Sequence, residues 1–147
     1  MKRLFSAAIL ATGLLVSQGA RAEVIAECTS SKGYTYFYPG PYVKESDRGF
    51  SEDATSKGST SIVTIGDKID VIFTDATGST QSSLSQGATI ITVGGVPDEG
   101  RLVVLVNYPD STVEIYSYHA MSKTLTHLQH RYKALITSSK LMVASCK

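Results

Sequence analysis

The sequence has no tryptophan and only two cysteines, three histidines and four prolines among its 147 residues. It lacks a Cys-x-x-Cys spacing and a cluster of cysteines and histidines, so the cysteines do not indicate a redox pair or a metal centre. Its basic residues form no stripe, which argues against a nucleic acid or an anionic membrane as partner. Apolar residues with helical periodicity are nearly absent, and this disfavours a helical fold.

The first 22 residues have the pattern of a secretory signal peptide. The second and third residues are basic, residues 4–16 are largely apolar, and residues 20–22 (Ala-Arg-Ala) offer a small-x-small cleavage site. The apolar stretch is shorter than the roughly 20 residues of a membrane-spanning helix. We therefore expect removal of residues 1–22 on export. This leaves a single β domain over 23–147, periplasmic or secreted, with no membrane span.

The two cysteines lie near the two ends of that domain. Cys28 comes early in the expected mature chain, and Cys146 is the second-last residue. Two cysteines in a small exported domain usually pair, and a disulfide needs Cα atoms within about 7 Å. We expect a Cys28–Cys146 bond that places the first and last strands side by side. Chain-entropy models predict that a disulfide closing such a long loop stabilises the folded state by about 4–5 kcal/mol.

Short apolar runs separated by turn residues predict an all-β antiparallel fold. A barrel of about eight strands, closed or nearly closed, is favoured because pairing of the first and last strands removes sheet edges. A two-sheet β-sandwich is the alternative. The expected strands lie near 24–30, 33–38, 60–65, 68–75, 79–85, 88–94, 101–108, 112–120, 124–132 and 139–146.

Two segments predict tight turns with a defined register. A two-residue loop at Gly66 and Asp67 would set Ile62 opposite Val71, with apolar residues on one face. The segment 75–78 (Asp-Ala-Thr-Gly) has the residue preferences of a type I turn.

A third hairpin is expected over the strands 101–108 and 112–120. A two-residue loop at 110–111 would set Tyr108 opposite Val113. In this register Tyr116 and Tyr118 share a face with Glu114, over Val103 and Leu105 of the neighbouring strand. Packing then explains these two tyrosines without a ligand.

Residues 39–59 are expected to form a long loop, because they contain two prolines and three glycines. The loop could contain a short helical turn near residues 51–54. Its carboxylates lack the spacing of a calcium loop, so we expect a solvated charged segment without a metal. These carboxylates are Glu45, Asp47, Glu52 and Asp53.

The clearest candidate for a binding surface is the tyrosine-rich segment 34–42. Tyr34, Tyr36 and Tyr38 alternate, so they share one face of a strand, and Tyr42 follows a Pro-Gly-Pro bend. Tyrosine combines a rigid ring with a polar tip, which suits stacking on a sugar or anchoring a protein partner. The alternative is that these rings pack in the core. We expect at least two of the first three to be solvent-accessible.

The three histidines do not have the spacing of a shared metal site. His127 and His130 point to opposite faces of a strand, and a hairpin through 122–123 places His119 opposite Thr126, far from His130. We expect no metal and no cofactor. A lone catalytic histidine stays open, because catalytic triads assemble from distant positions.

The layout resembles that of small exported, β-rich proteins of proteobacteria. The resemblance rests on the early cysteine before a tyrosine-rich strand, on "DVIFTDATGS", "LVVLVNYP" and "TVEIYSY", and on the terminal cysteine. It implies no activity. A looser likeness is to periplasmic lysozyme-inhibitor domains, whose Ser-x-Ser-Gly-type loop would correspond to "ATGSTQS" around Gly78 and Ser79. The segment departs from that pattern.

Three classes of function follow. The first is a non-enzymatic binding module that holds a protein or glycan of the cell envelope on Tyr34–Tyr42 and the 39–59 segment. The second is an inhibitor of an extracytoplasmic enzyme that acts through the turn at 75–78. The third is a small hydrolase that uses one of the three histidines.

Overall fold

The computed structural model describes residues 22–96 and 99–147, which form one antiparallel sheet of nine strands. All of the expected signal peptide except Ala22 lies outside the described residues. Within them, no helix has the length and apolar character needed to cross a bilayer. The elements are β1 (Ala22–Phe37), the 3₁₀ turn η1 (Glu45–Asp47), β2 (Gly49–Ile65), β3 (Lys68–Thr74), β4 (Thr80–Ser82), β5 (Thr89–Val96), β6 (Arg101–Tyr108), β7 (Thr112–His119), β8 (Thr124–Arg131) and β9 (Ser138–Cys146).

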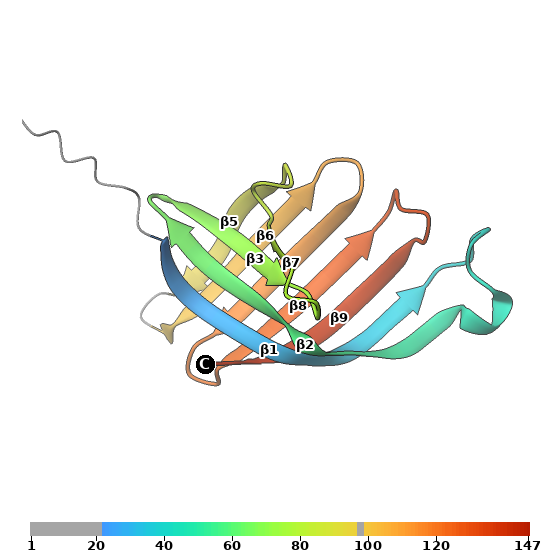
Figure 1. The fold of residues 1–147 in the computed structure, drawn as a ribbon, viewed down its shortest axis with the longest axis horizontal. Helices are drawn as coiled ribbons and strands as arrows, with labels where there is room; N and C mark the ends of the chain where they lie inside the picture. The colour runs from blue at the N-terminus through green and yellow to red at the C-terminus, as the bar shows by residue number, and fades with distance from the viewer. Residues whose placement is uncertain (1–21, 97–98) are drawn as a thin grey trace, which may run out of the picture.

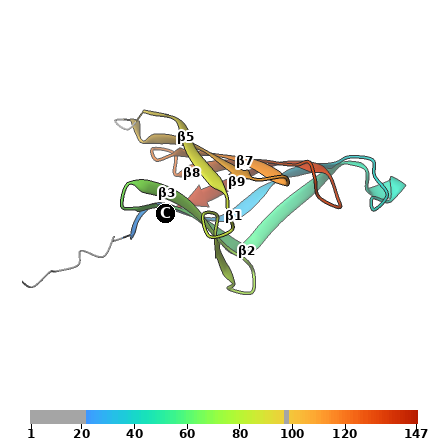
Figure 2. The same cartoon turned by 90° about the horizontal axis from the view of Figure 1, so that it is seen from above.

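The strands follow the order β4-β3-β2-β1-β9-β8-β7-β6-β5. Figure 1 shows the sheet strongly curled into a half-barrel. In Figure 2 one limb carries β1 to β3, and the other limb, which carries β5 to β9, faces it. The all-β antiparallel prediction is confirmed, and so is the prediction that the first and last strands are neighbours.

The predicted barrel of about eight strands, closed or nearly closed, is observed as an open half-barrel of nine strands, because β4 and β5 remain the two edges of the sheet. Only three residues of β4 pair with β3. The chain then turns out of the sheet through residues 83–88, where the Ala88 amide donates to the Ser83 carbonyl. The alternative, a two-sheet sandwich, is not observed, because all described strands belong to one sheet.

The long loop expected over 39–59 is mostly strand. β2 begins at Gly49 and pairs with β1 from Phe37 back to Ser31, whereas β3 pairs only with residues 59–65 of β2. The end of the β1–β2 hairpin, called here the arm, therefore extends past β3 (Figure 1). The helical turn expected at 51–54 is strand, and the short 3₁₀ turn lies at Glu45–Asp47. Pairing with β1 outweighs the low strand propensity of these glycines and charged residues.

β1 is also one continuous strand, where the sequence predicted two. Ser30 lies at a bulge with a φ of 56°, which explains the break in the sequence pattern.

The hairpin between β2 and β3 has the predicted register. Ile62 lies opposite Val71, and Gly66 in the two-residue loop has a φ of 64°. The turn at 75–78 is closed by a hydrogen bond from the Gly78 amide to the Asp75 carbonyl, 3.1 Å, as a type I turn requires.

The predicted register of the β6–β7 hairpin is wrong by one residue. Tyr108 lies opposite Thr112 rather than Val113, so the loop has three residues. Asp110 takes a φ of 60°, which lets the longer loop close. As a result, Tyr116 and Tyr118 lie opposite Val104 and Leu102 instead of over Leu105 and Val103.

The predicted disulfide is present. Cys28 and Cys146 are register partners in β1 and β9, with Cα atoms 3.9 Å apart and a sequence separation of 118 positions. Disulfides are typical of oxidising compartments. The bond lies in the buried cluster on the concave side of the sheet, which also includes Ala26, Ile62, Val71, Val104, Val106, Tyr116, Leu125 and Ala144.

Candidate functional site

The two faces of the curled sheet differ in chemistry. Alternate residues of a strand face opposite sides. On β6, Val104 and Val106 are fully buried on the concave side, and Leu105 between them faces outward. In the described residues the outer face has no second layer of strands or helices. The two faces therefore offer different surfaces to a ligand.

A continuous row of large apolar residues crosses six strands on the outer face. Each member is the register partner of the next, so their side chains lie in contact range of one another. The row, called here the apolar row, consists of Ile91, Leu105, Ile115, Leu128, Leu141 and Tyr34. Its ends are half-exposed, with 52% of Ile91 and 53% of Tyr34 accessible. Soluble monomers rarely leave such a contiguous apolar surface uncovered.

At the arm end of the apolar row lies a groove of about 900 Å³, called here the aromatic groove. Its walls include Tyr36, Tyr38 and Phe50. The ring of Tyr36 contacts Tyr38 and Phe50 edge to face, with centroids 4.9 and 5.0 Å apart. Two polar groups of the groove bond to Ser139. The Ser139 hydroxyl lies 3.2 Å from the Tyr38 hydroxyl and 2.8 Å from Nδ1 of His130.

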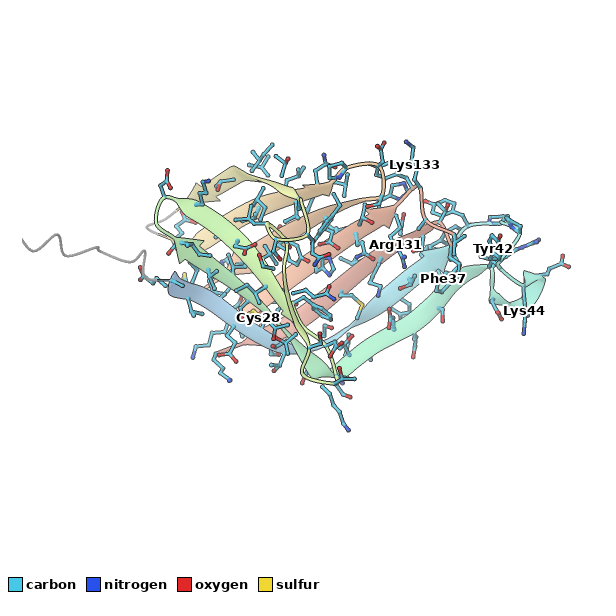
Figure 3. The ribbon with its side chains drawn as sticks, turned by 45° about the horizontal axis from the view of Figure 1, so that its top comes forward. Cys28, Phe37, Tyr42, Lys44, Arg131 and Lys133 are labelled. Carbon is cyan, nitrogen blue, oxygen red and sulfur yellow. A yellow bond between two sulfur atoms is a disulfide. The ribbon has the colours of Figure 1, made fainter. Side chains whose placement is uncertain are left out.

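The tyrosines predicted as a binding surface are only partly brought together. Tyr34, Tyr36 and Tyr38 all line the aromatic groove, and the first and third are exposed, so the prediction that at least two are accessible is confirmed. Tyr42 does not line the groove, and Figure 3 places it with Lys44 at the far end of the arm. A binding role for these residues stays a prediction.

The concave face holds a second site, a cavity of about 690 Å³, called here the concave cavity. Glu114 lines this cavity and is 6% exposed. Its carboxylate accepts hydrogen bonds from the Tyr116 hydroxyl (2.7 Å) and from Nε2 of Gln129 (2.6 Å). The ring of His127 stacks on Tyr116, with centroids 4.4 Å apart and planes 1° apart. These four residues therefore form one contact cluster on two adjacent strands.

The surroundings of Glu114 favour its charged form. Burial by itself raises the pKa of Glu114, but the nearby His127 and the hydrogen bonds from Gln129 and Tyr116 outweigh it, so the pKa lies below its usual value. The pKa of Tyr116 is raised well above its usual value by burial and by the adjacent carboxylate. Tyr116 therefore stays a neutral donor to a charged acceptor. Sequence reasoning missed this cluster because it assigned Tyr116 to packing.

A second polar cluster lies where the arm joins β9. Asp53 accepts a hydrogen bond from Thr35 (3.0 Å) and pairs with Lys140 (2.8 Å). The hydrogen bond from Lys140 is the main cause that lowers the pKa of Asp53. The sequence placed Asp53 in a solvated loop, whereas the structure places it in β2 opposite Gly33. The cluster fixes the arm to the body of the sheet.

The histidines are separate from one another. His119 lies opposite Thr124, not Thr126, and its Nδ1 is 2.7 Å from the Ser122 hydroxyl. Nε2 of His127 is buried without a hydrogen bond, 3.8 Å from Glu114 Oε1. The described residues contain no group of three or more His, Cys, Asp or Glu side chains placed to hold a metal ion. A hydrolase function stays a prediction.

The turn proposed for an inhibitor is well ordered by its own aspartate. Oδ1 of Asp75 accepts from the Thr77 amide (2.8 Å), the Thr77 hydroxyl (2.7 Å) and the Ser79 amide (3.0 Å). These bonds, chiefly those from Thr77, lower the pKa of Asp75. The inhibitor function stays a prediction.

In comparisons with known proteins, no family model, no curated protein and no solved structure matches the chain. The resemblance to small exported proteins of proteobacteria therefore stays a prediction.

Proposed function

We propose that the mature chain is an exported, non-enzymatic binding module that holds a protein of the cell envelope against its outer face. The observation that carries this proposal is the apolar row, which runs without interruption from Ile91 to Tyr34 and opens into the aromatic groove. Exposed aromatic and aliphatic side chains beside a groove are the usual anchors of a protein interface. The Cys28–Cys146 bond supports an oxidising location, either periplasmic or secreted.

The chemistry of the groove favours a protein over a glycan or a bilayer. A sugar needs free donors and acceptors, whereas the Ser139 hydroxyl is already bonded to Tyr38 and to His130. An anionic bilayer needs free cations, but the one lysine that lines the groove, Lys140, is paired with Asp53. The apolar side chains of a protein partner need neither free hydrogen-bonding groups nor free cations.

The shape of the sheet disfavours a second copy of this chain as the partner. The outer face is convex across the strands (Figure 2), so two copies placed back to back would touch along a narrow line. A stable interface buries roughly 800 Å² on each partner. The partner therefore has to wrap around the sheet or insert a segment into the aromatic groove.

The test uses two exposed groove residues and one matched control. Phe50 is 81% exposed and Tyr34 is 53% exposed, so Phe50→Ala and Tyr34→Ala should leave the fold intact. Tyr42→Ala is the control, because Tyr42 is 65% exposed but does not line the groove. The disulfide-bonded protein is cross-linked in the native envelope. The captured protein is then purified and titrated by calorimetry against all four forms.

We expect each groove variant to weaken binding about tenfold or more, as for a central aromatic anchor, and Tyr42→Ala to leave it unchanged. The proposal is wrong if the captured protein binds all four forms equally, or if no protein is captured. It is also wrong if the groove substitutions instead abolish self-association in sedimentation experiments or binding to lipid vesicles.

A further inference from the structure

The concave cavity carries polar side chains with free hydrogen-bonding capacity. Nε2 of Gln129 donates to Glu114, and the structure gives its carbonyl oxygen no partner among the described residues. Gln81, Gln86 and Thr112 also line the cavity. The cavity volume of about 690 Å³ lies within the range of small-molecule sites, roughly 300–1,000 Å³.

The charges of the cavity leave one cation without a partner. Lys140 is paired with Asp53, and Glu114 is held by Tyr116 and Gln129. Arg131 has no carboxylate within 4.0 Å among the described residues. It lies at the end of β8 that points toward the arm (Figure 3). A free guanidinium is suited to a carboxylate, which it binds through two parallel hydrogen bonds.

The cavity also offers an aromatic face. Phe73 of β3 lines the cavity from the opposite limb, and 43% of it is exposed. An exposed ring beside amides and hydroxyls suits a ligand with both an apolar face and many hydroxyl groups. A sugar ring has this combination, and the guanidinium adds a preference for a carboxylate on it.

We propose that the concave cavity binds an acidic carbohydrate, a short sugar chain that carries a carboxylate. Arg131 binds the carboxylate, Gln129 and Thr112 bind hydroxyl groups, and Phe73 contacts a ring face. This site is on the opposite side of the sheet from the aromatic groove. Gln129 and Lys140 line both, but Arg131, Thr112 and Phe73 line the cavity alone, so the proposal does not rest on the protein partner proposed above.

The experiment compares an acidic and a neutral sugar of equal length. Trigalacturonic acid and galactotriose are titrated into the disulfide-bonded protein by calorimetry, and amide shifts are mapped by NMR. The cavity variant is Arg131→Gln. The matched control is Arg101→Gln, because Arg101 does not line the cavity and pairs with Glu99 at the other end of the sheet. Tyr34→Ala serves as the outer-face control.

We expect the acidic trisaccharide to bind with a Kd below about 1 mM and to shift the amides of Thr112, Gln129 and Arg131. Arg131→Gln should weaken binding about tenfold, or roughly 1.4 kcal/mol, while Arg101→Gln and Tyr34→Ala bind like the native protein. Equal binding of both sugars, equal binding by Arg131→Gln, amide shifts confined to the outer face, or no binding at millimolar sugar would each overturn the proposal. Melting curves of the variants show whether the fold is retained.

Discussion

Gly33 and Leu141 approach each other across β1 and β9 more closely than any side chain would allow. A Cβ atom on Gly33 would lie 1.8 Å from the Leu141 carbonyl oxygen and 2.9 Å from Cα of Met142. The contact is between backbones, so a neighbouring rotamer cannot relieve it. It lies beside the pair of Tyr34 and Leu141, where the apolar row reaches the arm.

Gly33→Ala should therefore separate β1 from β9 at this point. We expect a loss of about 1–3 kcal/mol in the free energy of unfolding, as for other overpacked sites, together with weaker capture of the outer-face partner. Gly40→Ala is the matched control, because the nearest atom to its Cβ is 4.0 Å away. Urea unfolding of both variants measures the difference. Equal stability of the two would contradict the close contact.

The lowered pKa of Glu114 makes stability depend on pH in the acidic range. Its folded pKa lies below the unfolded value of 4.5, so as the pH falls the unfolded chain takes up the proton first. The stabilisation is complete above pH 4.5 and is lost as the pH falls through the folded pKa. Urea unfolding between pH 7 and pH 3 should show this loss.

Glu114→Gln isolates this contribution from Asp53 and Asp75, whose pKa values are also lowered. At pH 7 the variant should be less stable by about 1–3 kcal/mol, because Tyr116 and Gln129 lose a charged acceptor. The difference in free energy of unfolding between the native protein and the variant should then become smaller as the pH falls toward 3. A constant gap would show that Glu114 has the same pKa in both states.

The disulfide should account for a large part of the stability of the domain. Cys28→Ser combined with Cys146→Ser removes a link that spans 118 residues, and chain-entropy models predict a loss of about 4–5 kcal/mol. The native protein should gain mass corresponding to two alkylated thiols only after reduction. If alkylation succeeds without a reductant, the bond is absent in solution.

The turn at Asp75 gives a local prediction. Asp75→Ala removes the acceptor for the Thr77 and Ser79 amides, so both should exchange hydrogen faster, with little change elsewhere. Asp75→Asn keeps an acceptor oxygen and should largely restore protection. A lysozyme inhibition assay on the native protein and on Asp75→Ala tests the inhibitor alternative, and loss of inhibition in Asp75→Ala would favour it over the binding module.

Sequence reasoning was most reliable where local chemistry decides the structure. Glycine at position 66 supplies the positive φ of a two-residue loop, and the register around Ile62 followed from it. The β6–β7 register was wrong because Asp110, a residue other than glycine, takes a positive φ there. Nothing in the local pattern distinguishes a two-residue from a three-residue loop at that position.

The arm and the open edge could not be predicted, because both depend on pairing between distant segments. Glycines and charged residues in 49–59 favour a loop by propensity, yet pairing with β1 holds them in a strand. Closure of the barrel depended on the length of β4, which has only three residues. Both outcomes depend on contacts that sequence periodicity does not report.

The candidate binding surfaces were predicted in part. Alternation alone placed Tyr34, Tyr36 and Tyr38 on one face, as the structure has them. The apolar row was missed, although "RLVVLVNY" shows apolar residues on both faces of one strand. The cluster at Glu114 depends on Gln129, 15 residues away on the next strand, so only a correct register could have revealed it.

The strand order has a topological consequence. The sheet consists of two meanders, β1–β4 and β5–β9, that pair with each other through β1 and β9. Strands that follow one another in the chain are therefore neighbours in the sheet, except for β4 and β5, which form its two edges. A circular permutant with new ends at residues 83–88 would run from one edge of the sheet to the other, each strand beside its predecessor. The old ends need a linker of about six residues, because Ala22 lies six positions before the Cys28–Cys146 bond, or roughly 20 Å of strand. The pairing of β1 with β9, which in the native chain joins segments far apart in sequence, would become a hairpin between consecutive strands in the permutant.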